Sequence, residues 1–210
     1  AHFLEHMAFK GTTGRDARSL ETEVEDMGGH LNAYTSREQT CYYARVFSKD
    51  VPAALDILGD ILQRSVLDPA AVERERDVIL REMQEVEGVP EEVVFDHLHA
   101  TAFQRTPLGR TILGPAANVR SLTRDDLARY VRTHYTAPRM VVAAAGGVDH
   151  AALVGLAKKA LGGLPSDGPS TAGMVSAAPA HFTGSEVRVR DPDADKLHFA
   201  IAFKGAAWTD

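Results

Sequence analysis

The residues best suited to chemistry lie at the start of the chain, where His2, Glu5 and His6 form the pattern H-x-x-E-H. On a helix, residues four positions apart share a face with Cβ atoms about 6 Å apart, so both histidines would reach one ion. Catalytic zinc usually takes three protein ligands and a water, with imidazole nitrogens about 2.0–2.1 Å away. Glu5 projects from the same side as His2 and would take a proton from that water. The alternative is a chance pattern on a surface or core-capping helix.

A third ligand would come from the helix predicted over residues 70–87, which carries several carboxylates. At about 100° per residue, the apolar stripe of this helix consists of Val72, Ile79, Met83 and Val86. Glu75 and Glu82, two turns apart, lie together beside one edge of the stripe. A carboxylate beside a buried face needs a partner, because an unpaired buried charge is costly. From this helix alone, a metal ion and the guanidinium group of Arg76 or Arg81 are equally good partners for these two carboxylates.

Periodicity and capping residues predict the elements that would position these side chains. Helices are expected over residues 2–10, 16–27, 51–67, 70–87, 91–103, 123–135 and 149–161. A β-hairpin is expected over 30–36 and 40–48, and further strands over 139–146, 186–190 and 197–203. Residues 104–121 are predicted to be a loop, and 165–180 a loop or linker that leads into the last strands. Helices mixed with hairpins indicate an α+β fold, a two-layer domain of helices and antiparallel sheet.

Composition limits the classes of protein to which the chain belongs. Its 210 residues include 44% hydrophobic and 25% charged residues, which is ordinary globular composition. The formal net charge of −6 argues against a broad nucleic-acid surface, and no stretch approaches the roughly 20 apolar residues of a membrane helix. The single cysteine, Cys41, excludes an internal disulfide framework and is expected in the core. Because the chain begins at Ala1 without an initiator methionine or signal peptide, and its last strand has no finishing element, we expect a fragment truncated at both ends.

Six segments carry a resemblance to a known family: HFLEHMAFKGT, HLNAYTSREQT, ERERDVILREMQEVE, EEVVFDHLHATAF, LGRTILGP and VVAAAGGV. Together they resemble the pitrilysin family of metallopeptidases, the inverzincins, over essentially the whole chain. The resemblance implies that residues 1–210 form a single metallopeptidase domain from the N-terminal half of such a protein. It also places the distal glutamate ligand 76 residues after His6, at Glu82, with a supporting glutamate at Glu75.

The implied activity is that of a zinc metalloendopeptidase in which one Zn²⁺ is held by His2, His6 and Glu82. Such an ion lowers the pKa of its water towards about 7 and polarises the scissile carbonyl. Glu5 would act first as general base and then as general acid. Glu75 would orient a ligand, because ligating histidines usually donate their other N–H to a carboxylate or a carbonyl.

The resemblance also implies two places of contact with an extended peptide substrate. Residues 30–36 resemble the family's exposed edge strand, to which a peptide adds as a further strand. Asn32, Ala33 and Tyr34 would lie opposite the substrate backbone there, and a plain hairpin strand is the alternative. Phe9 resembles the aromatic residue that contacts the substrate residue after the cut. A core position on the helix face is the alternative for Phe9.

Glu92 and Asp96 lie four residues apart on a predicted helix and match positions that recognise a substrate arginine near the cleavage site. Two carboxylates suit a guanidinium group, because it forms paired hydrogen bonds with them. The alternative is a solvated acidic face, which is the more common reason for such a pair on a helix.

Within the family, the segments are most similar to the catalytic β subunit of a heterodimeric peptidase that removes N-terminal targeting presequences in the mitochondrial matrix. The implied partners are a non-catalytic α subunit and extended, arginine-containing presequence peptides. Two alternatives stay open: a core subunit of the ubiquinol–cytochrome c reductase complex, with a structural or a dual role, and a bacterial zinc peptidase of the same family. The intact His2, Glu5, His6 and Glu82 disfavour a purely structural subunit.

Overall fold

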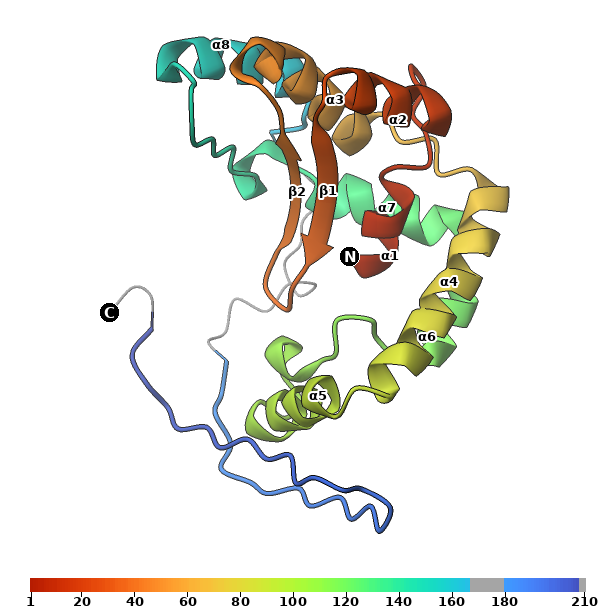
Figure 1. Ribbon diagram of the computed structural model, residues 1–210, viewed down its shortest axis with the longest axis vertical. Helices are drawn as coiled ribbons and strands as arrows, with labels where there is room; N and C mark the ends of the chain where they lie inside the picture. Colours follow the sequence, from red (N-terminus) through yellow and green to blue (C-terminus); the bar gives the residue numbers. More distant parts are fainter. Residues whose placement is uncertain (167–179, 208–210) are drawn as a thin grey trace.

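The computed structural model describes residues 1–166 and 180–207, which form eight α-helices and one β-hairpin (Figure 1). The helices are α1 (His2–Met7), α2 (Ala17–Asp26), α3 (Val51–Gln63), α4 (Pro69–Glu87), α5 (Pro90–Ala102), α6 (Ala116–Ser121), α7 (Arg124–His134) and α8 (His150–Leu161). The strands are β1 (His30–Thr35) and β2 (Thr40–Arg45), and short 3-10 helices cover Ser48–Asp50, Pro107–Gly109 and Ala137–Arg139. Over these residues, no helix is both long and apolar enough to cross a membrane.

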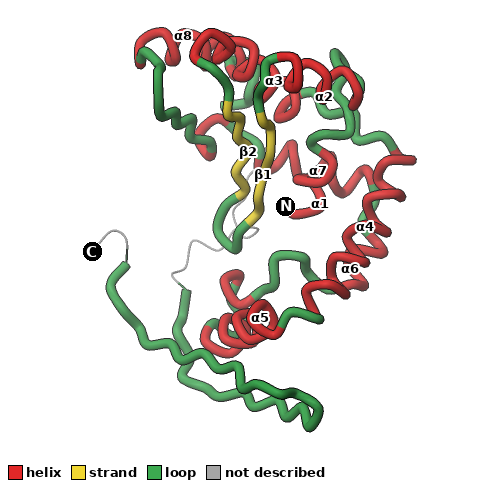
Figure 2. The backbone as a smooth tube through the Cα atoms, viewed as in Figure 1, coloured by secondary structure: helices red, strands yellow, loops and turns green. Residues whose placement is uncertain are grey.

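The hairpin stands in the middle of the fold, and α1 lies between β1 and α4 (Figure 1). Its strands are antiparallel, in a register that pairs His30 with Arg45 and Thr35 with Thr40. Helices α2, α3 and α8 gather at the end where the chain enters and leaves the hairpin, whereas α5 lies towards its turn. Figure 2 shows how far helix outweighs strand. The structure confirms the predicted α+β class, with a sheet of only two strands over the described residues.

Two apolar clusters hold these elements together. The first joins α1, α4, α6 and α7, and consists of Phe3, Leu4, Met7, Leu67, Ala71, Val72, Ile79, Val119 and Leu127. The second, between α2 and α3, consists of Leu20, Val24, Ile57 and Ile61, and the hairpin residues Leu31 and Tyr42 pack against it. A six-residue helix is too short to be stable alone, so α1 depends on packing its buried Phe3, Leu4 and Met7 against this framework.

Helix starts follow the capping residues in the sequence. The Asp68 side chain accepts a backbone hydrogen bond at the start of α4, and Pro69 is the first helical residue. Thr123 and Asp126 form a reciprocal capping box at the start of α7, and Asp149 caps α8. The predicted positions of these three helices are therefore confirmed.

The three strands predicted outside the hairpin are not formed in the described residues. In the segment 139–146, Arg139 ends a short 3-10 helix and the rest is irregular, and Val141 is 92% exposed rather than buried. Residues 186–190 and 197–203 have no strand pairing, and Phe203 is 88% exposed. Alternating apolar residues favour a strand, but a strand also needs a neighbour that supplies backbone hydrogen bonds. In the described part of the chain, β1 and β2 pair only with each other, so neither supplies these bonds.

The loop predicted over residues 104–121 is wrong in part, because it contains α6. This helix has six residues and one buried apolar side chain, Val119, which is too little to show a helical period. The helix predicted over 51–67 ends earlier, since α3 stops at Gln63. The loop or linker predicted over 165–180 falls mostly outside the described residues.

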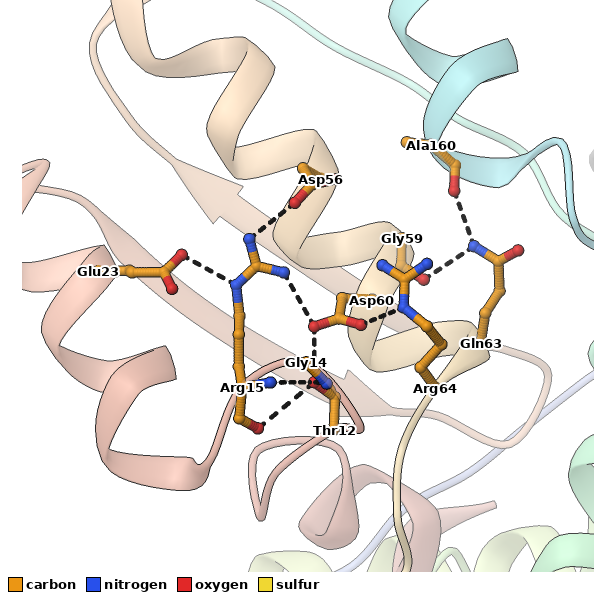
Figure 3. Close-up of polar contacts among 10 residues, drawn as sticks. All are labelled: Thr12, Gly14, Arg15, Glu23, Asp56, Gly59, Asp60, Gln63, Arg64 and Ala160. Atoms are coloured by element: carbon orange, nitrogen blue, oxygen red, sulfur yellow. Dashed lines mark hydrogen bonds and ion pairs between the residues drawn. The ribbon is translucent and has the colours of Figure 1, made fainter.

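A buried network of hydrogen bonds and ion pairs fixes the segment after α1 onto α3 (Figure 3). Asp60, which has no exposed surface, accepts hydrogen bonds from Thr12 Oγ1 at 2.6 Å and from Arg15 Nη1 at 2.9 Å, and Arg64 Nε binds its other oxygen. Burial alone would raise the pKa of Asp60, but these three hydrogen bonds outweigh it and hold the pKa below its ordinary value. The network thereby anchors the chain directly after α1.

Replacing Asp60 with asparagine is expected to lower the free energy of unfolding by about 3 kcal/mol, because breaking a buried ion pair leaves charges uncompensated. Asp56→Asn is the matched control. It removes an exposed partner of the same Arg15, 2.7 Å from Nη2, and should cost less than about 1 kcal/mol. Chemical denaturation of the full-length protein measures both variants.

The pH dependence of this contribution follows from the lowered pKa of Asp60 in the folded protein. The advantage of the wild type over Asp60→Asn is fully present above about pH 4 and is lost as the pH falls through the lowered pKa. Equal losses in Asp60→Asn and Asp56→Asn would contradict the buried network as the cause. A stability advantage of the wild type over Asp60→Asn that grows as the pH falls below about 4 would contradict it as well.

Candidate metal centre

Helices α1 and α4 bring together histidines and a glutamate that are far apart in the sequence. His2 and His6 lie one turn apart on α1, with ring centroids 4.7 Å apart. Glu82 approaches from α4, with Oε1 at 3.4 Å from His2 Nε2 and Oε2 at 3.3 Å from His6 Nε2. One ligand atom from each of the three residues lies within 4.8 Å of the other two. The predicted position of Glu82 next to both histidines agrees with this arrangement.

The spacing of these atoms fits a divalent ion. Ligands at two corners of a tetrahedron around zinc, each about 2.0–2.1 Å from it, are about 3.3–3.4 Å apart. His2 Nε2 is this far from Glu82 Oε1, and His6 Nε2 is this far from Glu82 Oε2. One ligand atom from each residue lies within 4.8 Å of the others, so the three side chains are close enough to converge on one ion. Glu82 Oε2 and Glu5 Oε2 are both buried without a hydrogen-bond partner in the described residues. Buried polar atoms are rarely left unpaired, and a cation with its water would satisfy both oxygens.

The environment of His2 favours its metal-binding form. Burial lowers the pKa of His2, and the negative charge of Glu82 opposes this only in part. An imidazole with a lowered pKa is neutral at pH 7, and the neutral ring is the form that binds metals. His2 is 9% exposed, whereas the side chain of Glu82 is 34% exposed, so the cluster has a buried side and an open side.

Glu75 lies behind His6, away from the side that faces Glu82. Its Oε2 is 3.2 Å from His6 Nδ1, and its Oε1 is 2.6 Å from Lys10 Nζ. A hydrogen bond from Nδ1–H to a carboxylate fixes the tautomer in which Nε2 is free to bind a metal. The sequence patterns did not predict a role for Lys10. The one indication is its position four residues after His6, which is one helical turn.

The salt bridge considered as an alternative for the two glutamates is wrong, because Arg76 and Arg81 have other partners. Arg76 Nη2 is 2.9 Å from Glu73 Oε1, and its guanidinium group also donates to the backbone oxygens of Val119 and Leu122. Arg81 Nε donates to the backbone oxygen of Asp77. The partners of Glu75 and Glu82 come from α1 and the turn after it, not from α4 itself.

The strand β1 lies beside α1, and over the described residues it pairs only with β2 (Figure 1). Asn32 and Tyr34 are exposed, whereas Ala33 is buried. The Ala33 N–H donates to Asn32 Oδ1 at 2.8 Å, so this backbone donor is already bonded to a side chain. Phe9 is partly buried against the cluster between α2 and α3. The contacts of all four residues with a substrate stay predictions.

The two acidic residues of α5 have different surroundings. Asp96 accepts a hydrogen bond from Arg37 in the hairpin turn, so a guanidinium group of this chain already binds it. Glu92 is exposed, and no ion pair to it is found within the described ranges. The structure therefore leaves Glu92 as the carboxylate that is available to a ligand, whereas Asp96 joins α5 to the hairpin.

Comparison with known proteins gives two matches to family models. The model of the insulinase peptidases (peptidase family M16) matches residues 1–116, and the model of the M16 peptidase inactive domain matches residues 121–210. Two solved structures have a similar fold. A protease from Helicobacter pylori has a TM-score of 0.75 at 23% identity, covering 81% of this chain and 41% of that one. An M16 inactive domain from Pseudomonas fluorescens has a TM-score of 0.72 at 15% identity, covering 79% of this chain and 41% of that one.

Several curated relatives are similar over nearly all of this chain. They include a probable mitochondrial-processing peptidase subunit beta from Arabidopsis thaliana, 63% identical over 100% of this chain and 40% of the relative. Proteins named mitochondrial-processing peptidase subunit beta are 56% identical in Neurospora crassa and 59% identical in Homo sapiens. They are matched over 100% and 99% of this chain, and over 44% and 42% of their own length. The chain thus spans less than half the length of these relatives.

Proposed function

Because this chain belongs to the insulinase peptidases of family M16, we propose that the protein that contains it is a zinc-dependent endopeptidase. The observation that carries the proposal is the cluster of His2, His6 and Glu82, with the carboxylate of Glu5 buried without a hydrogen bond on one oxygen. Two imidazoles and one carboxylate are the ligand set of several zinc peptidases. Glu5 has no role in a site that only binds metal, so its placement favours catalysis.

When it is bound by His2, His6 and Glu82, zinc would polarise the carbonyl of the scissile peptide bond and make a water molecule more acidic. The carboxylate of Glu5 takes a proton from the attacking water and later passes it to the nitrogen of the leaving amine. Glu75 accepts the hydrogen bond of His6 Nδ1–H and so holds the ring in one orientation. No serine or cysteine nucleophile is needed for this chemistry.

We infer further that the protein is the catalytic β subunit of a heterodimer that removes N-terminal targeting presequences in the mitochondrial matrix. Its expected partners are an α subunit and extended, arginine-containing presequence peptides, and residues 1–210 would belong to its N-terminal half. The names and the 56–63% identities of the plant, fungal and human relatives support this inference. They favour it over a bacterial zinc peptidase and over a core subunit of the ubiquinol–cytochrome c reductase complex.

An extended substrate would add to the edge of β1 that lies towards α1, since this places a peptide next to the metal ligands. Asn32, Ala33 and Tyr34 would then lie along the substrate backbone. The side chain of Asn32 would give up its bond to the Ala33 N–H if the substrate takes this donor. Phe9, which is only partly buried, would reach the residue after the cut with its exposed part.

Reconstitution tests this function directly. Full-length protein is combined with its α subunit and given a synthetic presequence peptide that contains arginine. We expect cleavage by the zinc-loaded enzyme, loss of cleavage after a chelator removes the zinc, and recovery when zinc is restored. Equal cleavage with and without zinc would contradict the proposed chemistry. Cleavage only of peptides that lack a basic presequence would contradict the proposed substrate.

Replacing Glu92 with glutamine is expected to lower kcat/KM for an arginine-bearing presequence peptide by about 10-fold. This is the lower end of the range for a hydrogen bond to a charged group, chosen because Glu92 is exposed. The same peptide with that arginine replaced by alanine should change by less than about 2-fold. Added salt should weaken the preference for arginine, because an exposed charge contact is screened.

Two controls separate this contact from general effects. Glu91→Gln makes the same change at the neighbouring exposed position of α5 and should alter neither peptide's kcat/KM. Asp96→Asn breaks the bond to Arg37 and is expected to slow both peptides alike, through the hairpin. If Glu92→Gln also slows both peptides equally, Glu92 does not recognise the substrate arginine.

A further inference from the structure

We propose that Lys10 is a positioning residue of the metal centre. Lys10 holds the carboxylate of Glu75 in place, and Glu75 in turn holds the ring of His6. This inference rests on the proposed zinc site. The contacts form a chain. Lys10 Nζ is 2.6 Å from Glu75 Oε1, and Glu75 Oε2 is 3.2 Å from His6 Nδ1. At the far side of the ring, His6 Nε2 is 3.3 Å from Glu82 Oε2. Lys10 thus reaches the ligand cluster through two contacts, without being part of it.

Burial explains why Glu75 needs this lysine. The side chain of Glu75 is 10% exposed, and a buried carboxylate is costly unless both oxygens have partners. His6 supplies a partner to Oε2 only. Without the ammonium group, Oε1 would have no partner, and Glu75 would rotate away from His6 to find one. With both oxygens held, the carboxylate stays in place as the acceptor for His6 Nδ1–H.

The backbone places Lys10 for this contact. The Lys10 N–H donates to the carbonyl oxygen of Met7 at 3.2 Å, which closes the turn at the end of α1. Gly11 follows with φ of +109°, a conformation that L side chains rarely adopt, and turns the chain away from α1. The side chain of Lys10 is 38% exposed, so it keeps contact with solvent although its ammonium group binds the buried Glu75.

Lys10 could affect zinc binding through its charge or through the orientation of Glu75. The two effects predict opposite changes in zinc affinity when Lys10 is replaced, so one measurement distinguishes them. A positive charge near the site disfavours a second cation, so removing it would strengthen zinc binding if charge were its main effect. Removing the orientation of Glu75 would weaken zinc binding instead. We expect orientation to dominate, because Lys10 contacts Glu75 directly at 2.6 Å while its partial exposure screens its charge from the ion.

The experiment measures zinc affinity by competition with a chelator, in full-length protein assembled with its α subunit. Lys10→Met keeps the unbranched stem of the side chain but removes its ammonium group, and should weaken zinc binding by about 10-fold, the lower end for residues that support a ligand. Lys10→Arg restores the ion pair and should stay within about 3-fold of wild type. Lys159→Met, at an exposed position of α8, is the matched control and should have no effect.

A double variant shows whether Lys10 acts through Glu75. If it does, Lys10→Met with Glu75→Gln binds zinc within about 2-fold of Glu75→Gln alone, because the two changes break one chain of contacts. Unchanged or stronger zinc binding in Lys10→Met would overturn the proposal. It would also be overturned if the loss of zinc affinity in the double variant equals the sum of the losses in the two single variants, expressed as free energies. A lower thermal midpoint of the zinc-free protein with unchanged zinc affinity would show a purely structural role and overturn it too. If the wild type itself takes up no zinc, the proposed function fails first.

Discussion

Replacing Glu5 with glutamine is expected to leave zinc bound and to lower kcat by about 10²–10⁴-fold, the usual contribution of a general acid or base. Glu5 lies on α1 between the two histidines in sequence, and its Oε2 is buried without a hydrogen bond in the described structure. It is not among the residues whose ligand atoms cluster. The amide of glutamine has nearly the same shape but does not accept a proton, so the variant loses the proton transfer and keeps the site.

Two measurements on the reconstituted enzyme decide the role of Glu5. Zinc content of the purified variant should equal that of the wild type, and KM for a presequence peptide should change much less than kcat. Glu21→Gln, the same change at an exposed position of α2, should leave both kcat and zinc content unaltered. Loss of zinc in Glu5→Gln, to the level found when His2 is replaced by alanine, would show that Glu5 is a ligand.

Replacing Glu82 with glutamine is expected to weaken zinc binding by more than 100-fold, because it removes the only carboxylate in the ligand cluster of the described residues. Its two oxygens lie 3.4 Å and 3.3 Å from His2 Nε2 and His6 Nε2, so no other described carboxylate shares this position. A neutral amide is a poorer ligand than a carboxylate for a dication. Activity should fall in proportion to the zinc lost, and excess zinc should restore part of it.

Variants of Glu75 and Glu85, which lie on the same helix, are compared with Glu82→Gln for their zinc affinity. Glu75→Gln should weaken zinc binding by about 10–100-fold, the effect of a residue that supports a ligand rather than binding the ion. Glu85→Gln, on the exposed side of α4, should bind zinc as the wild type does. Chelator competition ranks the three variants. Equal affinities in Glu82→Gln and Glu85→Gln would show that Glu82 is not the distal ligand.

Local periodicity in the sequence was enough to predict the outline of the centre. The spacing of His2 and His6 is one helical turn, and a helix of any protein places such residues on one face. The 3.6-residue period likewise predicts that Glu75 and Glu82 lie beside the apolar stripe of α4, because the stripe must face the core. The buried Val72 and Ile79 confirm this. Capping residues predicted where α4, α7 and α8 begin, since capping bonds also join near neighbours.

Only the tertiary structure decided which side chains meet across elements. Glu82 faces both histidines and Glu75 lies behind His6, a division of roles that the helical pattern of α4 does not contain. Lys10 on Glu75 and Arg37 on Asp96 are likewise contacts between distant segments.

The predicted strands over 139–146, 186–190 and 197–203 are absent from the described residues for the same kind of reason. A strand is completed by a neighbour, and no periodicity specifies that neighbour. Sequence periodicity determines which residues share a face, because helix and strand geometry is fixed by the backbone. Which faces then meet depends on how whole elements pack, because that packing sums many contacts between residues far apart in the chain.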